Sequence, residues 1–474
     1  GKIDLVYIDP PFDVGADFTM NVQIGDEKDS VLKEQSIMEA VAYKDTWGKG
    51  TDSYLHMMYE RLSLIRELLS DKGSIYVHCD WRVNSLLRLI MSEVFGKENF
   101  RNQITWHYYN KYSAATTCYP RAHDDILFYT KSASAIFNEF REQREAPVKQ
   151  LKRVNVGGVL KNARDEDGNI LYQTSEDKKV DDVWRIPQLQ PASSEWTGYS
   201  TQKHHDLLER IILASSNDDS IVADFFCGSG TTLAVAERFG RKWIGADLGR
   251  FSIHTTRKRM LQVQRELHSS GKPYRSFDVY NLGRYERQWW QKERLHGADN
   301  EHRATVMKFY KASELISSPS SLLHGKKGGA LIHIDEIDGM FTGEELVNVA
   351  KAASMAGAKE VHILAWEFEM ELTTRKQAIE AEHNVQIKLF YIPREIMESN
   401  RTECQFFEAG YLKANVLKGK DGKVDVALES FIPSLAEAPE KEVSALRERS
   451  VKSPFDFIDF WAVDFDYHKD KPFE

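Results

Sequence analysis

The first 130 residues alternate between two hydrophobic patterns. Continuous apolar runs are typical of strands buried on both faces, and apolar residues three and four positions apart are typical of amphipathic helices. The pattern predicts strands at 3–8, 74–78, 103–106 and 126–129, and helices at 55–69 and 84–95. Alternation of strands and helices indicates an α/β sheet.

The alternation stops between residues 132 and 195, where the chain is polar, rich in charge and short of long apolar runs. We interpret this stretch as an insertion with little core of its own. The pattern then resumes and predicts helices at 202–212 and 231–239 and strands at 221–225 and 243–246. The two halves of one sheet are therefore expected on either side of the insertion.

A further region begins near Thr305. Apolar runs at 330–334, 361–365 and 385–391 predict strands that are separated by helices, and β-rich sequence follows. We expect a second α/β domain there. The chain starts without Met inside a predicted buried strand and ends abruptly, so we also expect it to be a piece of a longer protein.

Length and composition narrow the class of protein. With 474 residues, of which 42% are hydrophobic, the chain is long enough for two or three domains. It contains no apolar run of membrane-spanning length, so no membrane segment is expected. The four cysteines are far apart, without the close pairs of a zinc site or a disulfide framework. This pattern predicts a cytoplasmic protein.

The charge is unevenly distributed along the chain. A formal net charge of -9 argues weakly against nucleic acid as a partner. Basic residues nevertheless outnumber acidic ones between Arg241 and Arg294, and a second basic stretch runs from Arg141 to Arg164. These stretches suit a polyanionic partner, although long basic side chains can also simply solvate helix faces.

The first chemical motif runs from Asp224 to Thr232 and joins a predicted strand to a helix through a glycine turn. Such a turn allows close approach of a ligand, and a helix N-terminus favours an anion. A dinucleotide fingerprint would need a glycine or alanine where Leu233 stands, and a phosphate-binding loop would need Gly-Lys before Ser or Thr. With these two motifs disfavoured, the carboxylate of a methionine moiety is a small anion that fits the turn. A tight turn that binds no ligand is the alternative.

Asp247 follows the next predicted strand. A carboxylate at this position can accept hydrogen bonds from both ribose hydroxyls of a nucleotide. Capping of the helix predicted to begin near Arg250 is the alternative.

The second motif, Asp9-Pro10-Pro11-Phe12, directly follows the first buried strand. Two prolines make a rigid loop, and ligands of open parallel sheets bind at the carboxyl ends of strands. The exocyclic amine of adenine is a poor nucleophile, because its lone pair is delocalised into the ring. Asp9 and the Pro10 carbonyl can accept its two N–H groups, and Phe12 can stack on a base swung out of the duplex.

These two motifs, in this order and with Thr201-Gln202-Lys203, resemble the β class of the N4/N6 amino-methyltransferases of DNA, which includes modification subunits of type III restriction systems. Residues 73–80 and 102–106 also match the pattern of this family. The resemblance implies S-adenosylmethionine as the cofactor, with no metal. The chain departs from the family pattern at His204, where a proline is usual, and at Phe225, which replaces the proline of the usual Asp-Pro-Phe.

The resemblance also implies a role for each matching residue. The target base is held by Asp9, Pro10, Pro11 and Phe12. The ribose is bound by Asp247, and Asp224 anchors the cofactor loop. The other residues expected at the cofactor are Gln202, Lys203, Phe226, Cys227, Gly228, Ser229, Gly230 and Thr231.

The predicted architecture is a Rossmann-like methyltransferase sheet with an inserted target-recognition segment, plus a C-terminal α/β domain. We expect the catalytic half of the core at 1–131, the recognition insertion at 132–195, the cofactor-binding half at 196–268, a linker at 269–304 and the second domain at 305–474.

The predicted reaction is methylation of adenine N6 in a specific site of double-stranded DNA, because family members with aspartate first in the catalytic motif are usually adenine-specific. Methylation of cytosine N4 or of RNA is an alternative within the class. A DNA-recognition module of a larger restriction or defence complex is an alternative outside it. A homodimer and a restriction or helicase partner subunit stay open, and a nicotinamide oxidoreductase is disfavoured by Leu233.

Overall fold

A computed structural model describes most of the chain, which divides into two compact units. One unit comprises Gly1–Phe18 and Met38–Ser276, and the other comprises Thr19–Ile37 and Phe277–Glu474. The described residues are 1–11, 20–23, 30–33, 51–111, 115–280, 283–295, 297–369, 372–397, 403–418, 424–433 and 452–458. Each unit is described by itself below.

The first unit is built on a seven-stranded sheet with the order β11-β5-β6-β4-β1-β12-β13. The strands β4, β1, β12 and β13 run parallel, whereas β6 is antiparallel to both β4 and β5. The bounds are β1 (Ile3–Ile8), β4 (Leu69–Cys79), β5 (Phe100–His107), β6 (His123–Thr130), β11 (Val183–Arg185), β12 (Ile221–Asp224) and β13 (Lys242–Gly245).

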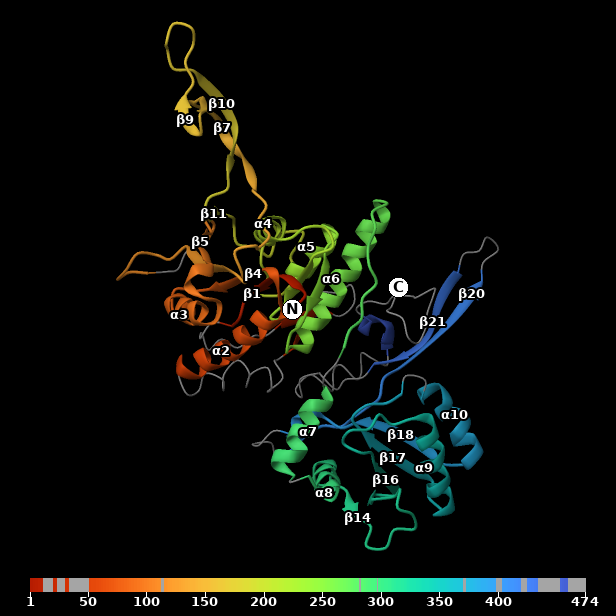
Figure 1. Cartoon of the computed structure of the whole chain (residues 1–474). Helices are drawn as coiled ribbons and strands as arrows, with labels where there is room; N and C mark the ends of the chain where they lie inside the picture. Colours follow the sequence, from red (N-terminus) through yellow and green to blue (C-terminus); the bar gives the residue numbers. More distant parts are fainter. Residues whose placement is uncertain are drawn as a thin grey trace. The chain divides into compact units, whose positions relative to one another are not determined.

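Helices cover both faces of this sheet, so the unit has three layers (Figure 1). Val6 and Ile8 of β1 pack on one face with α2 (Thr51–Leu68) and α3 (Asn84–Phe95). Leu5 and Tyr7 pack on the other with α4 (His205–Ser215) and α5 (Thr231–Arg238), and α6 (Arg250–Ser269) lies against α5. Both faces of β1 are buried, which explains its unbroken apolar sequence. The predicted fold class is confirmed.

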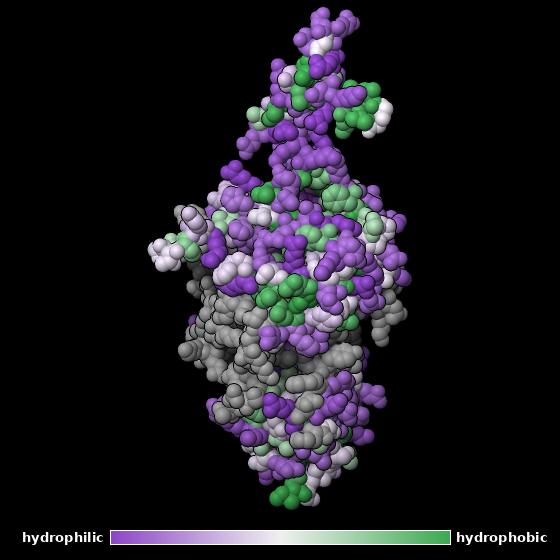
Figure 2. All heavy atoms as spheres, turned by 60° about the vertical axis from the view of Figure 1, so that its left-hand side comes forward, coloured by the Kyte–Doolittle hydropathy of each residue, from purple (hydrophilic) through white to green (hydrophobic). Residues whose placement is uncertain are grey.

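The segment between the two halves of the sheet forms a projecting β arm (Figure 1). Its long ribbon pairs β7 (Arg141–Leu151) with β10 (Tyr172–Lys179), and a short hairpin pairs β8 (Arg153–Val156) with β9 (Val159–Asn162). Nearly all its side chains are exposed, and Figure 2 shows apolar ones gathered on it. This segment therefore has little core, as its polar sequence predicts.

The second unit holds a six-stranded sheet with the order β14-β15-β16-β17-β18-β19, whose strands β16, β17 and β18 are parallel. Helices α9 and α10 contribute to the core on one face and α7 and α8 to the core on the other. The bounds are α7 (Gly283–Arg294), α8 (Asp299–Tyr310), β14 (Ser313–Glu314), β15 (Gly325–Lys327), β16 (Ala330–Ile334), α9 (Gly343–Met355), β17 (Glu360–Ala365), α10 (Leu372–His383), β18 (Gln386–Tyr391) and β19 (Phe407–Glu408).

The stretch expected as a linker, 269–304, is largely helical, since it contains α7 and the start of α8. Trp290 is buried against the rings of His302 and Trp366 in the core of the second unit. The stretch therefore contributes to the core of the second unit, although most of its residues are polar or charged.

The remaining elements are small. They are the paired strands β2 (Met20–Gln23) and β3 (Ser30–Lys33), the hairpin of β20 (Tyr411–Lys418) and β21 (Val424–Ile432), and the 3-10 turns η1 (Lys97–Asn99), η2 (Arg394–Met397) and η3 (Pro454–Phe457). Within the described residues, no helix is both long and apolar enough to cross a membrane.

Candidate active site

The two sequence motifs meet at the carboxyl edge of the first sheet. In the parallel register Leu5 of β1 is paired with Val222 of β12, and Ile8 with Val77 of β4. Asp9 therefore emerges beside the end of β4 and close to the loop that follows β12. Open α/β sheets bind their ligands at this edge, so the fold gathers the predicted site residues where a ligand is expected.

Asp224, the last residue of β12, shapes the glycine loop from beneath. Its carboxylate accepts hydrogen bonds from the backbone N–H of Phe226 at 3.0 Å and from Oγ1 of Thr232 at 2.6 Å. The side chain is buried, and burial raises its pKa to about 7. Asp224 thus ties the strand to the first turn of α5, an anchoring role that leaves it away from solvent.

Gly228 and Gly230 both adopt the left-handed backbone conformation, with φ of 50° and 73°. A Cβ atom on Gly230 would lie 2.6 Å from Cγ2 of Thr256, and one on Gly228 would lie 3.2 Å from the ring of Tyr199. The loop is therefore restricted to glycine by conformation and by its neighbours. Immediately before Gly228, the amide of Cys227 donates to the carbonyl of Ala246 at 3.1 Å.

Asp247 lies beside the same loop. Its two oxygens accept the backbone N–H groups of Gly228 and of Gly249, each at 2.8 Å. Gly249 is the N-cap residue of α6, and among the described residues the start of this helix has no side-chain cap hydrogen bond, so the structure does not support the capping alternative. The Ser252 side chain and the Leu248 backbone are also hydrogen-bonded to this carboxylate, so ribose hydroxyls would have to compete for its lone pairs. Burial raises the pKa of this side chain.

Arg259 of α6 supports the first residues of α5 from inside. Its guanidinium donates to Oγ1 of Thr231 at 2.7 Å and approaches the carbonyl of Ser229 at 3.4 Å. Burial lowers the pKa of Arg259 to about 10. The sequence places Arg259 on an unremarkable amphipathic helix, and only the packing of α6 against α5 reveals this contact.

Gln202 is buried and closes the loop that precedes α4. Its amide nitrogen donates to the carbonyl of Glu195 at 2.6 Å, and its amide oxygen accepts from the backbone N–H of Thr197 at 2.9 Å and from the Thr197 hydroxyl at 2.6 Å. The functional groups of Gln202 are therefore used within the loop, which makes it a support for the neighbouring Lys203.

Lys203 contacts the Asp-Pro-Pro-Phe motif directly, across 194 residues of sequence. Its ammonium group donates to Oδ2 of Asp9 and approaches the carbonyl of Thr201 at 3.4 Å. Pro10 is buried and Pro11 is half-buried. The structure therefore joins Asp9 and Lys203 into one site, whereas Phe12 lies outside the described residues.

A buried polar cluster behind Asp9 was missed by the sequence reasoning. His78 of β4 is fully buried, and its ring contacts Asp9, Asp124 and Tyr7. Burial acts to raise the pKa of Asp124, but His78, Lys203 and Tyr108 together hold that pKa below its ordinary value. The only signal in the sequence was a histidine at the end of an otherwise apolar strand. The sequence alone does not reveal which residues this histidine contacts.

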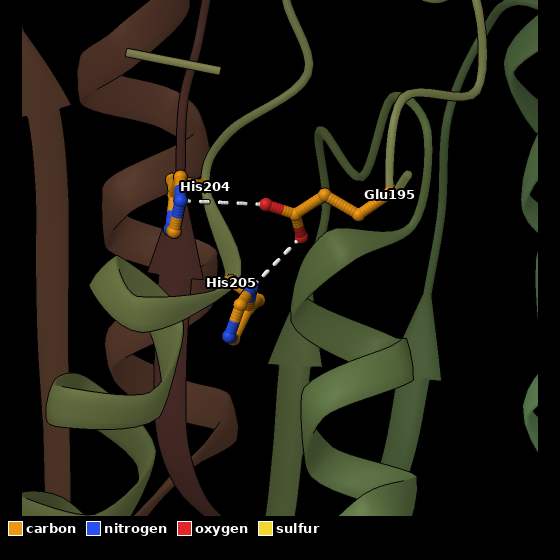
Figure 3. A group of neighbouring side chains, drawn as sticks. All are labelled: Glu195, His204 and His205. Atoms are coloured by element: carbon orange, nitrogen blue, oxygen red, sulfur yellow. Dashed lines mark hydrogen bonds and ion pairs between the residues drawn. The ribbon is translucent and has the colours of Figure 1, made fainter. Parts of the chain in front are cut away.

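Two overlapping groups among the described residues have side chains close enough to hold a metal ion. Figure 3 shows one of them, with His204 and His205 facing different oxygens of Glu195. Nε2 of His204 lies 3.5 Å from Oε1 and Nδ1 of His205 lies 2.9 Å from Oε2. The second group is His205, Asp206 and Glu209. These contacts also satisfy the side chains without an ion, so neither group indicates a metal by itself.

Comparison with known proteins places this site in a family. The model of the N6/N4 DNA methylases matches residues 3–258, which is more than half of the chain and spans both motifs. The chain therefore belongs to the N6/N4 family of DNA methylases. S-adenosylmethionine is the methyl donor of this family, in agreement with the predicted cofactor.

Individual relatives match the same part of the chain. The type II methyltransferase M.EcaI of Enterobacter cloacae is 28% identical over 309 residues, which cover 54% of this chain and 64% of the relative. The DNA adenine methyltransferase YhdJ of Escherichia coli (strain K12) is 26% identical, over 52% of this chain and 72% of the relative. The chain thus spans slightly less than two thirds of M.EcaI.

Among solved structures, the complex of M1.HpyAVI with S-adenosylmethionine has a TM-score of 0.33 and 18% sequence identity. The match covers 55% of this chain and 89% of that one.

Proposed function

We propose that this protein transfers a methyl group from S-adenosylmethionine to the N6 amine of adenine in double-stranded DNA. The observation that carries the proposal is the meeting of Asp9 and Lys203 beside the glycine loop at the carboxyl edge of the sheet. Aspartate in the first position of the catalytic motif favours adenine over cytosine. The relative named as a DNA adenine methyltransferase agrees with this choice.

Asp9 is the residue that would act on the amine. Its carboxylate accepts an N–H group of the target, which draws the nitrogen toward a tetrahedral form and frees its lone pair for attack. Pro10 and Pro11 hold the following backbone rigid, so that the Pro10 carbonyl can accept the second N–H group. Holding the amine and the methyl donor together in line can supply up to roughly 7–11 kcal/mol in favourable cases.

The glycine loop and Asp247 fit the cofactor. When bound, S-adenosylmethionine supplies an electrophilic methyl group on sulfur. Gly228 and Gly230 present backbone without side chains; a Cβ atom on Gly230 would collide with Thr256, and one on Gly228 would be in tight contact with Tyr199. Asp247 lies beside the loop, and ribose hydroxyls would replace part of its present contacts, such as the one with the Ser252 side chain. The N-terminus of α5 favours the methionine carboxylate.

The decisive experiment is methyl transfer from labelled S-adenosylmethionine to mixed genomic DNA, followed by nucleoside mass spectrometry. N6-methyladenine is the expected product. N4-methylcytosine would overturn the assignment of the target base while keeping the class of reaction. An absence of product, with S-adenosylhomocysteine still bound, would favour a DNA-recognition module over an enzyme.

The substitution Asp9→Ala tests the assigned mechanism. We expect methyl transfer to fall at least 1,000-fold, roughly the loss that follows removal of a group acting on the reacting atoms. Binding of S-adenosylhomocysteine, measured by calorimetry, should not change. Retention of substantial methylation in the variant would show that Asp9 is not the group that binds the amine.

A further inference from the structure

His78 is a fully buried polar residue of the first sheet that lies next to the catalytic motif. It stands on β4, one position beyond Val77, which is paired with Ile8 of β1. This register puts the imidazole ring beside Asp9, the residue that follows Ile8. The side chain of His78 has no exposed surface, whereas that of Asp9 is 17% exposed.

Each nitrogen of the His78 ring faces a polar group. Nδ1 lies 3.4 Å from Oδ1 of Asp9 and 3.1 Å from the hydroxyl of Tyr7. Nε2 lies 3.3 Å from Oδ2 of Asp124, whose other oxygen accepts from the Tyr108 hydroxyl at 3.4 Å. The ring is therefore held between carboxylates that come from two different parts of the sheet.

Both oxygens of the Asp9 carboxylate consequently have a basic partner. Oδ1 faces the imidazole of His78 and Oδ2 accepts from the ammonium group of Lys203. A carboxylate that is held at one oxygen can turn about its Cβ–Cγ bond. With Oδ2 bonded to Lys203 and Oδ1 in ion-pair contact with His78, rotation of the carboxylate is restricted, and with it the direction of the lone pairs left for a substrate.

We propose that His78 is a positioning residue which, fixed by Asp124 and Tyr7, orients the Asp9 carboxylate for the amine of the target base. The inference rests on the proposed function, because the amine is its object. His78 acts through Asp9 and does not touch the substrate itself. Loss of a supporting group that locks a functional side chain typically costs about 10–100-fold in activity or affinity.

A buried histidine could instead serve only to stabilise the sheet. A double-mutant cycle distinguishes the two roles, since a residue that acts through Asp9 loses its effect when Asp9 is already impaired. The variants are His78→Leu and His78→Gln, each made alone and together with Asp9→Asn. Tyr76→Phe is the matched control: Tyr76 lies two residues earlier on β4, is equally buried and bonds Ser215 at 2.7 Å.

With wild-type Asp9, we expect His78→Leu to lower kcat about 100-fold and His78→Gln about tenfold, because the glutamine amide can still donate toward Asp9. The Kd for S-adenosylhomocysteine and the KM for DNA should change by less than about twofold. In the Asp9→Asn background, His78→Leu should cost no more than about threefold further. Tyr76→Phe should lower the melting temperature without lowering kcat.

Equal losses of kcat from His78→Leu in both backgrounds would overturn the proposal, as would equal kcat for the Leu and Gln variants. The rate is counted as methyl groups transferred, whatever base receives them. A product other than N6-methyladenine would therefore refute the proposed target base and leave the cycle interpretable. Melting temperatures of every variant separate a loss of folding from a loss of orientation.

Discussion

Leu233 stands where a dinucleotide-binding turn has its third small residue, and the structure shows how the first sheet accommodates it. The site of a Cβ atom on Gly245 lies only 2.4 Å from Cδ2 of Leu233. The glycine that allows the helix to approach the strand is thus on β13 instead of α5. The same close packing is therefore reached with the small and large residues exchanged, so Leu233 is accommodated without the third small residue of a dinucleotide-binding turn.

Gly230 provides a test of the loop at the residue scale. Gly230→Ala combines a left-handed backbone with a collision at Thr256, so we expect a loss of about 2–3 kcal/mol in the free energy of unfolding and weaker S-adenosylhomocysteine binding. Gly240→Ala is the matched control, because its φ is 72° but nothing lies within 4 Å of the added atom. It should lose about 1 kcal/mol in denaturant unfolding. Equal losses would refute the role of the Thr256 contact.

The raised pKa of Asp224 predicts that the free energy of unfolding depends on pH. Its pKa is raised by burial to about 7 in the folded chain, against an ordinary value near 4 in the unfolded one. The folded state therefore holds the proton more tightly, and the contribution of Asp224 to stability falls as pH rises between the two values. Asp224→Asn removes this dependence while keeping an oxygen for the Phe226 amide.

The difference in stability, variant minus wild type, should accordingly rise by up to about 1.4 kcal/mol per pH unit between pH 4.5 and 6.5 and level off above pH 8. Thermal or urea unfolding across this range measures it. Asp71→Asn, at an exposed site, should give a flat difference. A flat difference for Asp224→Asn would mean that its carboxylate is ionised throughout.

At the scale of elements, the loop before α4 contacts the Asp-Pro-Pro-Phe motif that follows β1. Residues 195–202 are folded around the amide of Gln202, and the next residue, Lys203, reaches Asp9. The function of the Thr-Gln-Lys element is thus divided. The glutamine shapes the loop, and the lysine enters the site.

Gln202→Leu should therefore lower the rate of methyl transfer indirectly, by disturbing the loop that positions Lys203. We expect kcat to fall about tenfold and the free energy of unfolding to fall by about 1–3 kcal/mol, because three hydrogen bonds are lost in a buried place. Methyl transfer and urea unfolding provide the two measurements. Gln190→Leu, an exposed change close by, should alter neither. Unchanged kcat in Gln202→Leu would show that Lys203 is positioned independently of the loop.

At the scale of the whole molecule, the β arm is the clearest candidate for recognition of DNA. Exposed basic residues accompany exposed apolar ones on it: Lys149, Lys152, Arg153, Val154, Val156, Val159, Leu160 and Lys161. Basic side chains suit phosphate contacts, and a two-stranded ribbon fits the major groove of DNA. Its contribution to the main cores is small, since neither core cluster of the first unit includes a residue of the ribbon.

Replacement of residues 144–176 by Asn-Gly would join the ribbon where Gln143 is paired with Asp177. We expect the shortened protein to keep S-adenosylhomocysteine affinity and to melt within about 3 °C of the intact chain. Methylation of DNA should fall more than about 100-fold. Electrophoretic mobility shifts and labelled transfer provide the readouts. Undiminished, site-specific methylation would place recognition elsewhere.

Several features of this protein follow from the sequence by itself. The fold class and most of the regular elements follow from local periodicity, because buried strands and amphipathic helices carry their own patterns. The glycine loop, the Asp-Pro-Pro-Phe motif and the family are equally local, since each depends on neighbouring residues in a fixed order. The family model spans both motifs accordingly.

The tertiary structure alone decided which distant groups meet. Lys203 reaches Asp9, His78 lies between Asp9 and Asp124, and Arg259 supports Thr231 only because parallel register and helix packing bring them together. Trp290, in the stretch expected as a linker, likewise enters a core formed mostly by later residues. Such contacts join positions tens to hundreds of residues apart, and no local pattern encodes them. The hydrophobic pattern of the sequence thus determined the helices and strands, and tertiary packing determined which residues form the site.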